Sequence, residues 1–329
     1  MTRARAPRAL VRLTWVLVAS VAVSLGLLAS PASAAMVSPS PSPGAAAPSP
    51  RPAPPRPPIP TAAFHITVMP DVGTVIGVAY PITAKFSVPV LDRAAAEHHM
   101  HVYVNKLFSN GAWYWRNSTT AMFRLAGFWP GHATIEVRLT LAGVEVAHGP
   151  TLRYVGAAST TRTHVIRTDR SLVAMVDGIK DRFTVVVDGK VVAVFKTSLG
   201  KKGFETRSGI KAVMEKYAVH HMTSVAAGIT DPKDQYDLQV PWAVRITPTG
   251  EFVHGAPWAT ARLGRYNGSH GCTNLSSADA KWFFDHVIPG DAVVTTGTPR
   301  SMEFWNGPGA PYNMPWAQWL AKSSTKGKP

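Results

Sequence analysis

One stretch, residues 254–274, holds the side chains most capable of nucleophilic chemistry. It contains the only cysteine of the 329-residue chain, Cys272, with His254 at its start and His270 two positions before the thiol. A thiolate is a strong nucleophile, and a neighbouring imidazole can take the thiol proton at neutral pH. The stretch is also rich in Gly, Arg and Asn, which favours a loop. It therefore predicts a cysteine nucleophile held on a loop between two histidines.

Either histidine offers an imidazole, but their positions differ. His270 lies only two positions before Cys272, so the local backbone restricts where its imidazole can lie relative to the thiol. We therefore favour His254 as the general base. Attack on a carbonyl also needs N–H donors aimed at the developing oxyanion. The backbone N–H groups of the Gly271–Cys272 turn are candidates, because glycine lets the backbone approach a substrate closely.

The chain from residue 160 to 297 reads as a β-rich domain that would position these groups. Asp188–Gly189 lies between two β-branched runs, which predicts a hairpin with a type I′ turn. Residues 241–255 (PWAVRITPTGEFVHG) predict a second hairpin, turned at Thr249–Gly250. This hairpin places His254 at the end of a strand, where a rigid scaffold can hold a catalytic group open to substrate.

A short helix is predicted directly after the nucleophile. Residues 275–287 (LSSADAKWFFDHV) begin with Ser276 and Asp279 in the spacing of a capping box. The helix can present one apolar face to the core, made of Trp282, Phe283 and Val287.

Residues 61–155 predict an all-β sandwich, because apolar and β-branched runs recur between turn residues at short intervals. The tryptophans of this region are expected to pack in the core, with a glycan-binding platform as the alternative: Trp113, Trp115 and Trp129. Three histidines invite a metal site but have no carboxylate or cysteine beside them, so a solvated strand edge is favoured: His98, His99 and His101.

Residues 298–329 form a Trp-rich C-terminal extension that ends in a basic tail. Three exposed tryptophans would make a large apolar patch, so the extension is expected to fold back and bury them. These tryptophans are Trp305, Trp316 and Trp319.

The N-terminal sixty residues predict export. Residues 1–34 have a positive start, an apolar run and the small-residue cleavage pattern Ala32–Ser33–Ala34 of a signal peptide. A membrane tether is expected only if this signal stays uncleaved. Residues 35–60 are rich in Pro, Ser and Ala, which predicts an extended linker without a fold. The protein is therefore expected to act outside the cytoplasm.

Export makes the single cysteine informative. In an oxidising compartment cysteines commonly form disulfides, but Cys272 has no second cysteine in its own chain to pair with. The thiol is inert and buried, forms an intermolecular bridge, or is reactive. The polar loop around it argues against burial in an apolar core.

The chain is basic, with a formal net charge of +15. Six basic residues lie in the first sixty positions, which contain no acid, so residues 61–329 carry +9. Such a body favours anionic surfaces. No nucleic-acid recognition motif accompanies the charge, so no nucleic-acid partner is expected. Paired metal-ligand motifs and phosphate-binding glycine loops are absent from the sequence, and we expect neither a metal nor a cofactor.

The motifs VHGAPW, SHGCTNLSSADAKWFF and PGDAVV together resemble the L,D-transpeptidase catalytic domain of the YkuD type. The upstream text PDVGTVIGVAYPITAKFSVPVLDR, with AWYWR and FWPGHATIEV, is similar to the immunoglobulin-like domain of actinobacterial members. The resemblance covers most of the chain after residue 61. It implies a mainly β protein: an immunoglobulin-like sandwich, then a β-rich catalytic domain with one or a few short helices.

The resemblance also assigns roles to individual residues. Cys272 matches the nucleophile, His254 the general base, and the carbonyl of Gly255 the group that orients this imidazole. Thr273 departs from the apolar residue that many members carry, and we expect little effect. The remaining matched positions are His270 and the oxyanion N–H of Gly271 at the catalytic centre, and Tyr236 (a lid residue), Trp258, Ser269 and Asn274 at the substrate.

The activity implied by the resemblance is acyl transfer on peptidoglycan. The thiolate attacks the donor tetrapeptide stem, D-alanine leaves, and an acceptor amine of a second stem resolves the thioester into a 3→3 cross-link. Carbapenem-type β-lactams are the expected covalent inhibitors. The alternatives are a carboxypeptidase or hydrolase that uses the same thiol with water, and a non-catalytic wall-binding protein.

Overall fold

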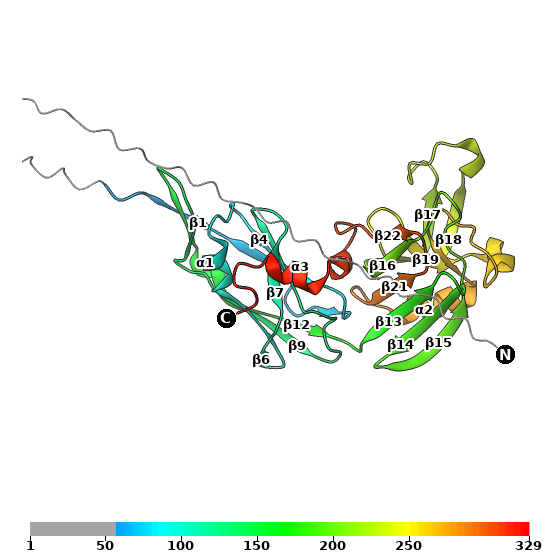
Figure 1. Cartoon of the computed structure of the whole chain (residues 1–329), viewed down its shortest axis with the longest axis horizontal. Helices are drawn as coiled ribbons and strands as arrows, with labels where there is room; N and C mark the ends of the chain where they lie inside the picture. Colours follow the sequence, from blue (N-terminus) through cyan, green and yellow to red (C-terminus); the bar gives the residue numbers. More distant parts are fainter. Residues whose placement is uncertain (1–56, 329) are drawn as a thin grey trace, which may run out of the picture. The chain divides into compact units, whose positions relative to one another are not determined.

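A computed structural model of the chain describes residues 57–328. The predicted export signal and the linker up to residue 56 lie outside the described residues. The architecture is mainly β, with a sandwich followed by a β-rich domain, as the sequence predicts (Figure 1). Among residues 57–328, no helix combines the length and apolar character needed to cross a bilayer.

The sandwich consists of a four-stranded sheet in the order β2-β4-β8-β7, a five-stranded sheet in the order β3-β12-β9-β5-β6, and a small sheet β1-β11-β10. Its elements are β1 (Thr61–Phe64), β2 (Ile66–Met69), β3 (Val75–Ile76), β4 (Ile82–Phe86), α1 (Arg93–Glu97), β5 (Met100–Val104), β6 (Leu107–Phe108), β7 (Ala112–Trp115), β8 (Thr120–Arg124), β9 (Thr134–Thr140), β10 (Glu145–His148), β11 (Arg153–Gly156), η1 (Ala158–Thr160) and β12 (Thr161–Thr168). Strand β12 pairs with β9 and β3, so the sandwich extends to Thr168 rather than ending near residue 155. The sequence misplaced this boundary because β12 is as rich in β-branched residues as the strands on either side.

The sandwich tryptophans belong to the core, as predicted. Trp113, Trp115 and Trp129 are all at most 5% exposed. Each buried indole N–H has an acceptor: the carbonyl of Met100, the carboxylate of Glu97 and the carbonyl of Tyr80, respectively. A buried indole with a satisfied N–H is a packing residue, and it presents no face to a sugar ring. The glycan-platform alternative is therefore wrong for these three side chains.

The second domain is built on a six-stranded sheet, β15-β14-β13-β21-β16-β22, and a four-stranded sheet, β17-β18-β19-β20. Its elements are β13 (Leu172–Asp177), β14 (Arg182–Val187), β15 (Lys190–Lys196), β16 (Arg207–Ala212), β17 (Glu215–Thr223), η2 (Pro232–Asp234), β18 (Asp237–Arg245), β19 (Phe252–Gly255), η3 (Pro257–Arg262), β20 (Thr273–Leu275), α2 (Ser277–His286), β21 (Ala292–Thr296) and β22 (Arg300–Ser301). A core of buried aliphatic and aromatic residues from both sheets and α2 holds the domain together.

Local signals in the sequence account for the hairpins and the helix around the site. Asp188 and Gly189 have φ values of 47° and 79° between β14 and β15, which confirms the predicted turn. The hydroxyl of Ser276 accepts the N–H of Asp279, so the capping box at the start of α2 is also confirmed. Phe283 of the predicted apolar face is fully buried in the core.

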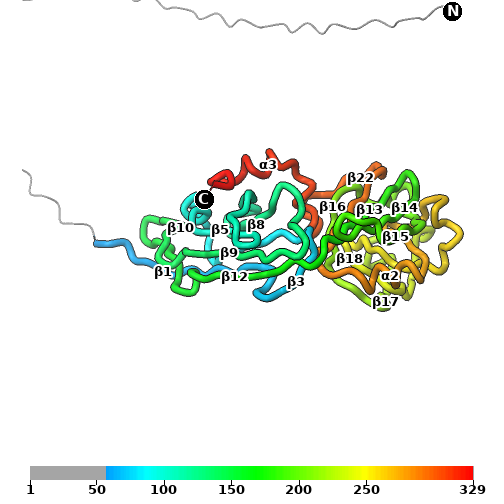
Figure 2. Tube along the Cα trace, turned by 90° about the horizontal axis from the view of Figure 1, so that it is seen from below, coloured from blue at the N-terminus to red at the C-terminus, as the bar shows by residue number. Residues whose placement is uncertain are grey.

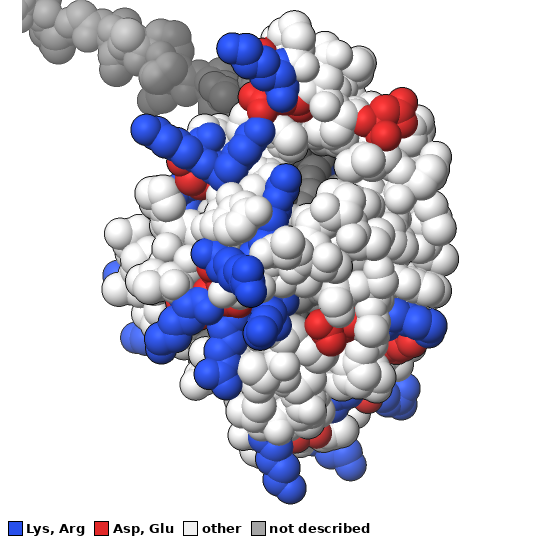
Figure 3. Space-filling view, turned by 90° about the vertical axis from the view of Figure 1, so that its right-hand side faces the viewer, with Lys and Arg blue, Asp and Glu red and all other residues white. Residues whose placement is uncertain are grey.

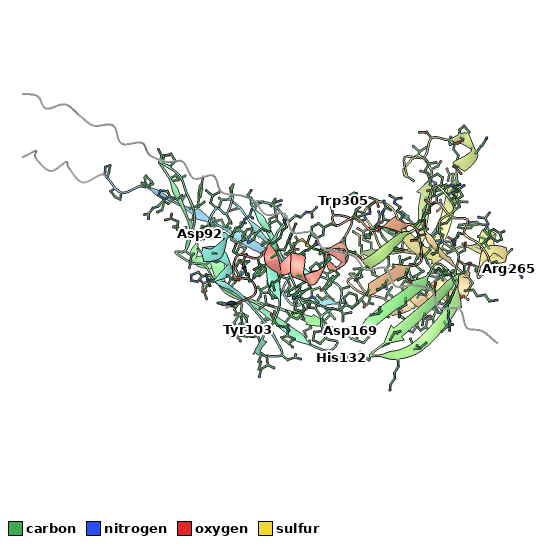
Figure 4. All side chains as sticks on the ribbon, in the orientation of Figure 1. Asp92, Tyr103, His132, Asp169, Arg265 and Trp305 are labelled. Atoms are coloured by element: carbon green, nitrogen blue, oxygen red, sulfur yellow. The ribbon has the colours of Figure 1, made fainter. Side chains whose placement is uncertain are left out.

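The C-terminal extension, with η4 (Ala310–Asn313) and α3 (Trp316–Ala321), folds back on the sandwich (Figures 1 and 2). Trp319 is fully buried, stacks on Tyr114 and donates its indole N–H to the carbonyl of Ala112 at 2.9 Å. Trp316 is only partly buried. The prediction is wrong for Trp305, which is 56% exposed on the segment before η4 (Figure 4): its neighbour Phe304 packs against Tyr114 of the sandwich instead, with 5.3 Å between ring centroids.

Backbone contacts join the sandwich to the catalytic domain. The N–H of Gly77 donates to the carbonyl of Pro289 at 2.9 Å, and the N–H of Ala79 donates to that of Gly290 at 2.8 Å. A Cβ added at Gly77 would lie 2.0 Å from the backbone nitrogen of Asp291, so only glycine fits this junction. Nε2 of His132, on the sandwich, also lies 3.1 Å from Oδ2 of Asp188, on the catalytic domain.

Candidate active site

A cavity of about 840 Å³ opens on the four-stranded sheet of the second domain. Strands β17, β18 and β19, the loop from η3 to β20, and the segment before β16 supply its walls. The side chains predicted for the chemistry line this one cavity: Tyr236, His254, Trp258, Ser269, His270, Gly271, Cys272 and Asn274. Its volume is in the range of cavities that enclose most of a small ligand.

Strand register brings the base to the nucleophile. Strands β19 and β20 are parallel neighbours, with His254 opposite Asn274 and Val253 opposite Thr273. Cys272 is the residue immediately before β20, so both functional side chains emerge at neighbouring positions of one sheet and line the same cavity. The eighteen-residue separation in sequence is closed by the loop that includes η3. The pairing of base and nucleophile, which the sequence could only suggest, follows from this register.

The imidazole of His254 is held in one tautomer. Its Nδ1 lies 2.9 Å from the carbonyl oxygen of Gly255, which can only accept, so Nδ1 carries the proton and Nε2 keeps its lone pair. The residue is 5% exposed. Burial lowers the pKa of His254 to about 4, and the Gly255 carbonyl opposes that shift only in part. The imidazole is therefore a neutral base over the whole physiological range.

Cys272 lies partly exposed at the cavity wall. Its Sγ is 3.7 Å from the carbonyl of Gly250 and receives a hydrogen bond from the backbone N–H of Phe252. Burial raises the pKa of the Cys272 thiol to about 12. Both partners are consequently neutral at rest. An attack by this sulfur would therefore need transfer of the proton from Sγ to His254 in the same step.

The turn before the nucleophile is fixed by a serine. The hydroxyl of Ser269 donates to the carbonyl of Cys272 at 2.6 Å and accepts the N–H of Gly271 at 3.2 Å. Gly271 has a φ of 118°, which favours glycine. Because its N–H is engaged in this way, Gly271 is a weaker oxyanion donor than the sequence suggested. The N–H of Cys272 has no partner within residues 57–328 and is the better placed donor.

Strands β17 and β18 form a long hairpin (Figure 1), and residues of its tip line the cavity. Tyr236, at the base of the tip, packs over the ring of His270 with 5.0 Å between centroids. Asp234 of η2 forms ion pairs with Lys201 and with His270, whose Nε2 lies 3.4 Å away. His270 thus joins the lid to the nucleophile loop, which agrees with the choice of His254 as the base.

Two further predicted residues shape the cavity. Trp258 is 45% exposed and stacks near His254, with 6.1 Å between ring centroids. Asn274 is buried, and its backbone pairs with Ser198 through an N–H to carbonyl bond of 2.9 Å. Trp258 offers an apolar face to a ligand, and Asn274 anchors the strand behind the nucleophile.

The sequence missed a buried charged cluster beside the cavity: Arg207, Lys211, Glu251 and Glu303. Three of its members are less than 10% exposed. The available signal was the spacing of Arg207 and Lys211, which puts both on one face of a strand that also carries buried Ala212. Residues 200–209 (GKKGFETRSG) read instead as a loop, because they contain three glycines and two lysines.

One of the three clustered sandwich histidines has a polar partner on a neighbouring strand. His99 Nδ1 lies 3.0 Å from the hydroxyl of Thr140, and no cluster of three His, Cys, Asp or Glu side chains with ligand geometry occurs in residues 57–328.

Comparison with known proteins agrees with this geometry. Residues 171–295 match the YkuD family, described as the L,D-transpeptidase catalytic domain, and residues 58–145 match a bacterial Ig domain. Probable L,D-transpeptidase 3 of Mycobacterium tuberculosis is 32% identical over 243 residues, which cover 69% of this chain and 84% of that protein. The chain belongs to the L,D-transpeptidase family.

Two other L,D-transpeptidases extend the comparison. L,D-transpeptidase 2 of Mycobacterium tuberculosis is 34% identical over 262 residues, which cover 78% of this chain but only 62% of that longer protein. A solved L,D-transpeptidase in complex with imipenem is 31% identical, with a TM-score of 0.59, and covers 73% of this chain and all of its own. The catalytic domain and the Ig domain of this L,D-transpeptidase thus both have counterparts of known fold.

Proposed function

We propose that the protein forms 3→3 cross-links between peptidoglycan stem peptides through a thioester on Cys272. The observation that carries the proposal is a thiol and a neutral imidazole in one cavity, with the carbonyl of Gly255 leaving Nε2 of His254 free as the base. Membership of the L,D-transpeptidase family supplies the substrate class. The donor is a tetrapeptide stem, and the acceptor is the side-chain amine of a second stem.

The reaction then follows from the site. Sγ bonds to the donor carbonyl carbon while Nε2 of His254 takes the thiol proton, and the N–H of Cys272 faces the oxyanion. The C–N bond to D-alanine breaks, and His254 returns the proton to the leaving nitrogen. The acceptor amine attacks the thioester next, the S–C bond breaks, and Cys272 recovers its proton. In acylation His254 takes the proton of the thiol, and in deacylation a proton is returned to the thiol, so one residue serves both half-reactions.

Product analysis tests the proposal. Incubation of the protein with a tetrapeptide donor and an acceptor stem should release D-alanine and give a dimer linked 3→3, as read by mass spectrometry. Donor alone measures hydrolysis. Release of D-alanine at the same rate with and without the amine, and no dimer, would replace the transpeptidase with a carboxypeptidase that uses the same thiol. If D-alanine were released in neither mixture, the remaining interpretation would be a non-catalytic wall-binding protein.

We also propose that the protein acts outside the cytoplasm, because residues 1–34 have the pattern of an export signal. Lys and Arg side chains gather more densely than Asp and Glu on the face of the catalytic domain in Figure 3, which suits an anionic wall. The mature chain should begin at Ala35 in the exported fraction, as N-terminal sequencing would read. An intact Met1 start on a membrane-bound form would indicate an uncleaved tether.

A further inference from the structure

The buried charged cluster lies directly behind the nucleophile. Glu251 is the residue between Gly250, whose carbonyl is 3.7 Å from Sγ of Cys272, and Phe252, whose N–H reaches the same sulfur. Its side chain also approaches Gly271, where an added Cβ would lie 3.8 Å from Cγ of Glu251. The carboxylate is thus attached to the strand that contacts the sulfur and lies beside the turn that presents it.

Arg207 explains why a carboxylate occupies this place. The backbone N–H of Arg207 donates to Oε1 of Glu251 at 3.0 Å, and Nη1 donates to the same oxygen at 2.8 Å. The guanidinium also pairs with Glu303. Glu251 therefore fastens β19 to β16, and so fixes the two backbone groups that contact Sγ. A carboxylate serves well as such an anchor, because charge-assisted bonds are short and directional.

An anchor of this kind has an electrostatic cost for the chemistry. A carboxylate near a sulfur opposes the negative charge that develops on it during attack. Glu251 raises the pKa of Cys272 in addition to the effect of burial, whereas Lys211 lowers it. The other titratable residues around the sulfur contribute little charge. His254 is neutral, and burial raises the pKa of Tyr236, which keeps its phenol protonated. The imidazole of His270 pairs with Asp234.

Two cations offset the charge of Glu251: Arg207, which is shared with Glu303, and Lys211, which pairs with no other carboxylate in residues 57–328. Lys211 is fully buried, and three oxygens surround its Nζ: Oε2 of Glu251 at 2.9 Å, the hydroxyl of Thr295 at 3.2 Å and the carbonyl of Arg207. Burial lowers the pKa of Lys211, and Glu251 opposes that shift. Nζ donates hydrogen bonds to the Arg207 carbonyl and the Thr295 hydroxyl and lies within ion-pair distance of Glu251, which suits an ammonium ion.

We propose that Lys211 is a positioning residue for acyl transfer: its buried ammonium neutralises Glu251, so that the carboxylate can anchor strand β19 without opposing charge on Sγ of Cys272. The inference rests on the proposed function for its meaning, since it concerns the same nucleophile. It adds two residues, Lys211 and Glu251, whose removal should act on the thiol in opposite directions. A purely structural role would make both substitutions act in the same direction.

Alkylation of Cys272 by iodoacetamide at pH 8 tests the inference without any stem peptide. Lys211→Met should slow alkylation about tenfold, because about one unit of thiol pKa corresponds to a tenfold change in thiolate. Glu251→Gln should accelerate it, and the double variant should return close to the wild-type rate. Arg138→Met, which removes a cation paired with Glu136 on the sandwich, is the matched control and should alkylate at the wild-type rate.

Several results would overturn the inference: a Lys211→Met rate equal to wild type, both single variants slower, or a double variant slower than Lys211→Met. If Lys211→Met does not fold, as read by near-ultraviolet circular dichroism, the Glu251→Gln and double variants still decide. A Glu251→Gln rate at or below wild type then rejects the inference. A wild-type Cys272 that never alkylates instead contradicts the proposed function.

Discussion

Replacing Cys272 by alanine should reduce D-alanine release and dimer formation by on the order of 10⁴-fold or more, because no other group in the cavity can form the acyl intermediate. The sulfur is the only thiol of the chain, and it lines the cavity with the base. Release of D-alanine from a tetrapeptide donor, measured by coupled assay, checks the loss. The fold should survive, since the side chain is partly exposed and makes one weak contact through its S–H.

Cys272→Ser is the matched control for this prediction. It keeps the size and hydrogen bonding of the side chain but lacks the nucleophilicity of sulfur, so it should be as inactive as the alanine variant. Thermal melting should give both variants a transition close to wild type. Activity of the alanine variant within tenfold of wild type would show that the reacting group lies elsewhere.

Replacing His254 by glutamine should lower the acylation rate by on the order of 10³-fold, the usual range for loss of a general base. The effect is large because burial raises the pKa of the Cys272 thiol to about 12, so unassisted ionisation is rare at neutral pH. Single-turnover acylation of wild type and variant, followed at pH 7, measures the ratio. His270→Gln is the control: it should weaken activity less, since His270 faces Asp234 of the lid.

The pH dependence of this pair follows from the direction of its shifts. A lowered imidazole pKa keeps the base neutral as the medium becomes acid, so wild-type acylation should hold from pH 9 down and fall only near the pKa of about 4. In His254→Gln the thiol must lose its proton to solvent, and the rate should rise about tenfold per pH unit. A wild-type acylation rate that falls near pH 6.5, the pKa of an imidazole in water, would contradict the burial of the His254 imidazole.

Much of the site could be predicted from the sequence because its signals are local. The Ser276 capping box and the Asp188–Gly189 turn depend on neighbouring residues, and both occur as expected. The choice of His254 over His270 also needed only the sequence separation. The sequence also placed His254 at a strand end, and the structure confirms this: His254 is the penultimate residue of β19.

The remainder depends on contacts between distant segments, which no local pattern encodes. The Lys211–Glu251 pair joins residues forty positions apart, and each reads alone as an exposed charge. The engagement of the Gly271 N–H by Ser269 depends on the geometry of a single turn. Trp305 and Trp319 carry the same side chain, and only the path of the chain decides that one is exposed and the other buried.

Intact-mass analysis with imipenem tests the central claim most directly, because the reaction needs only a nucleophile in the cavity. The account predicts one covalent equivalent on the wild type, mapped by peptide analysis to the fragment that contains Cys272, and no adduct on Cys272→Ala. An adduct that persists on the alanine variant, or a wild type whose mass is unchanged after prolonged exposure, would contradict it.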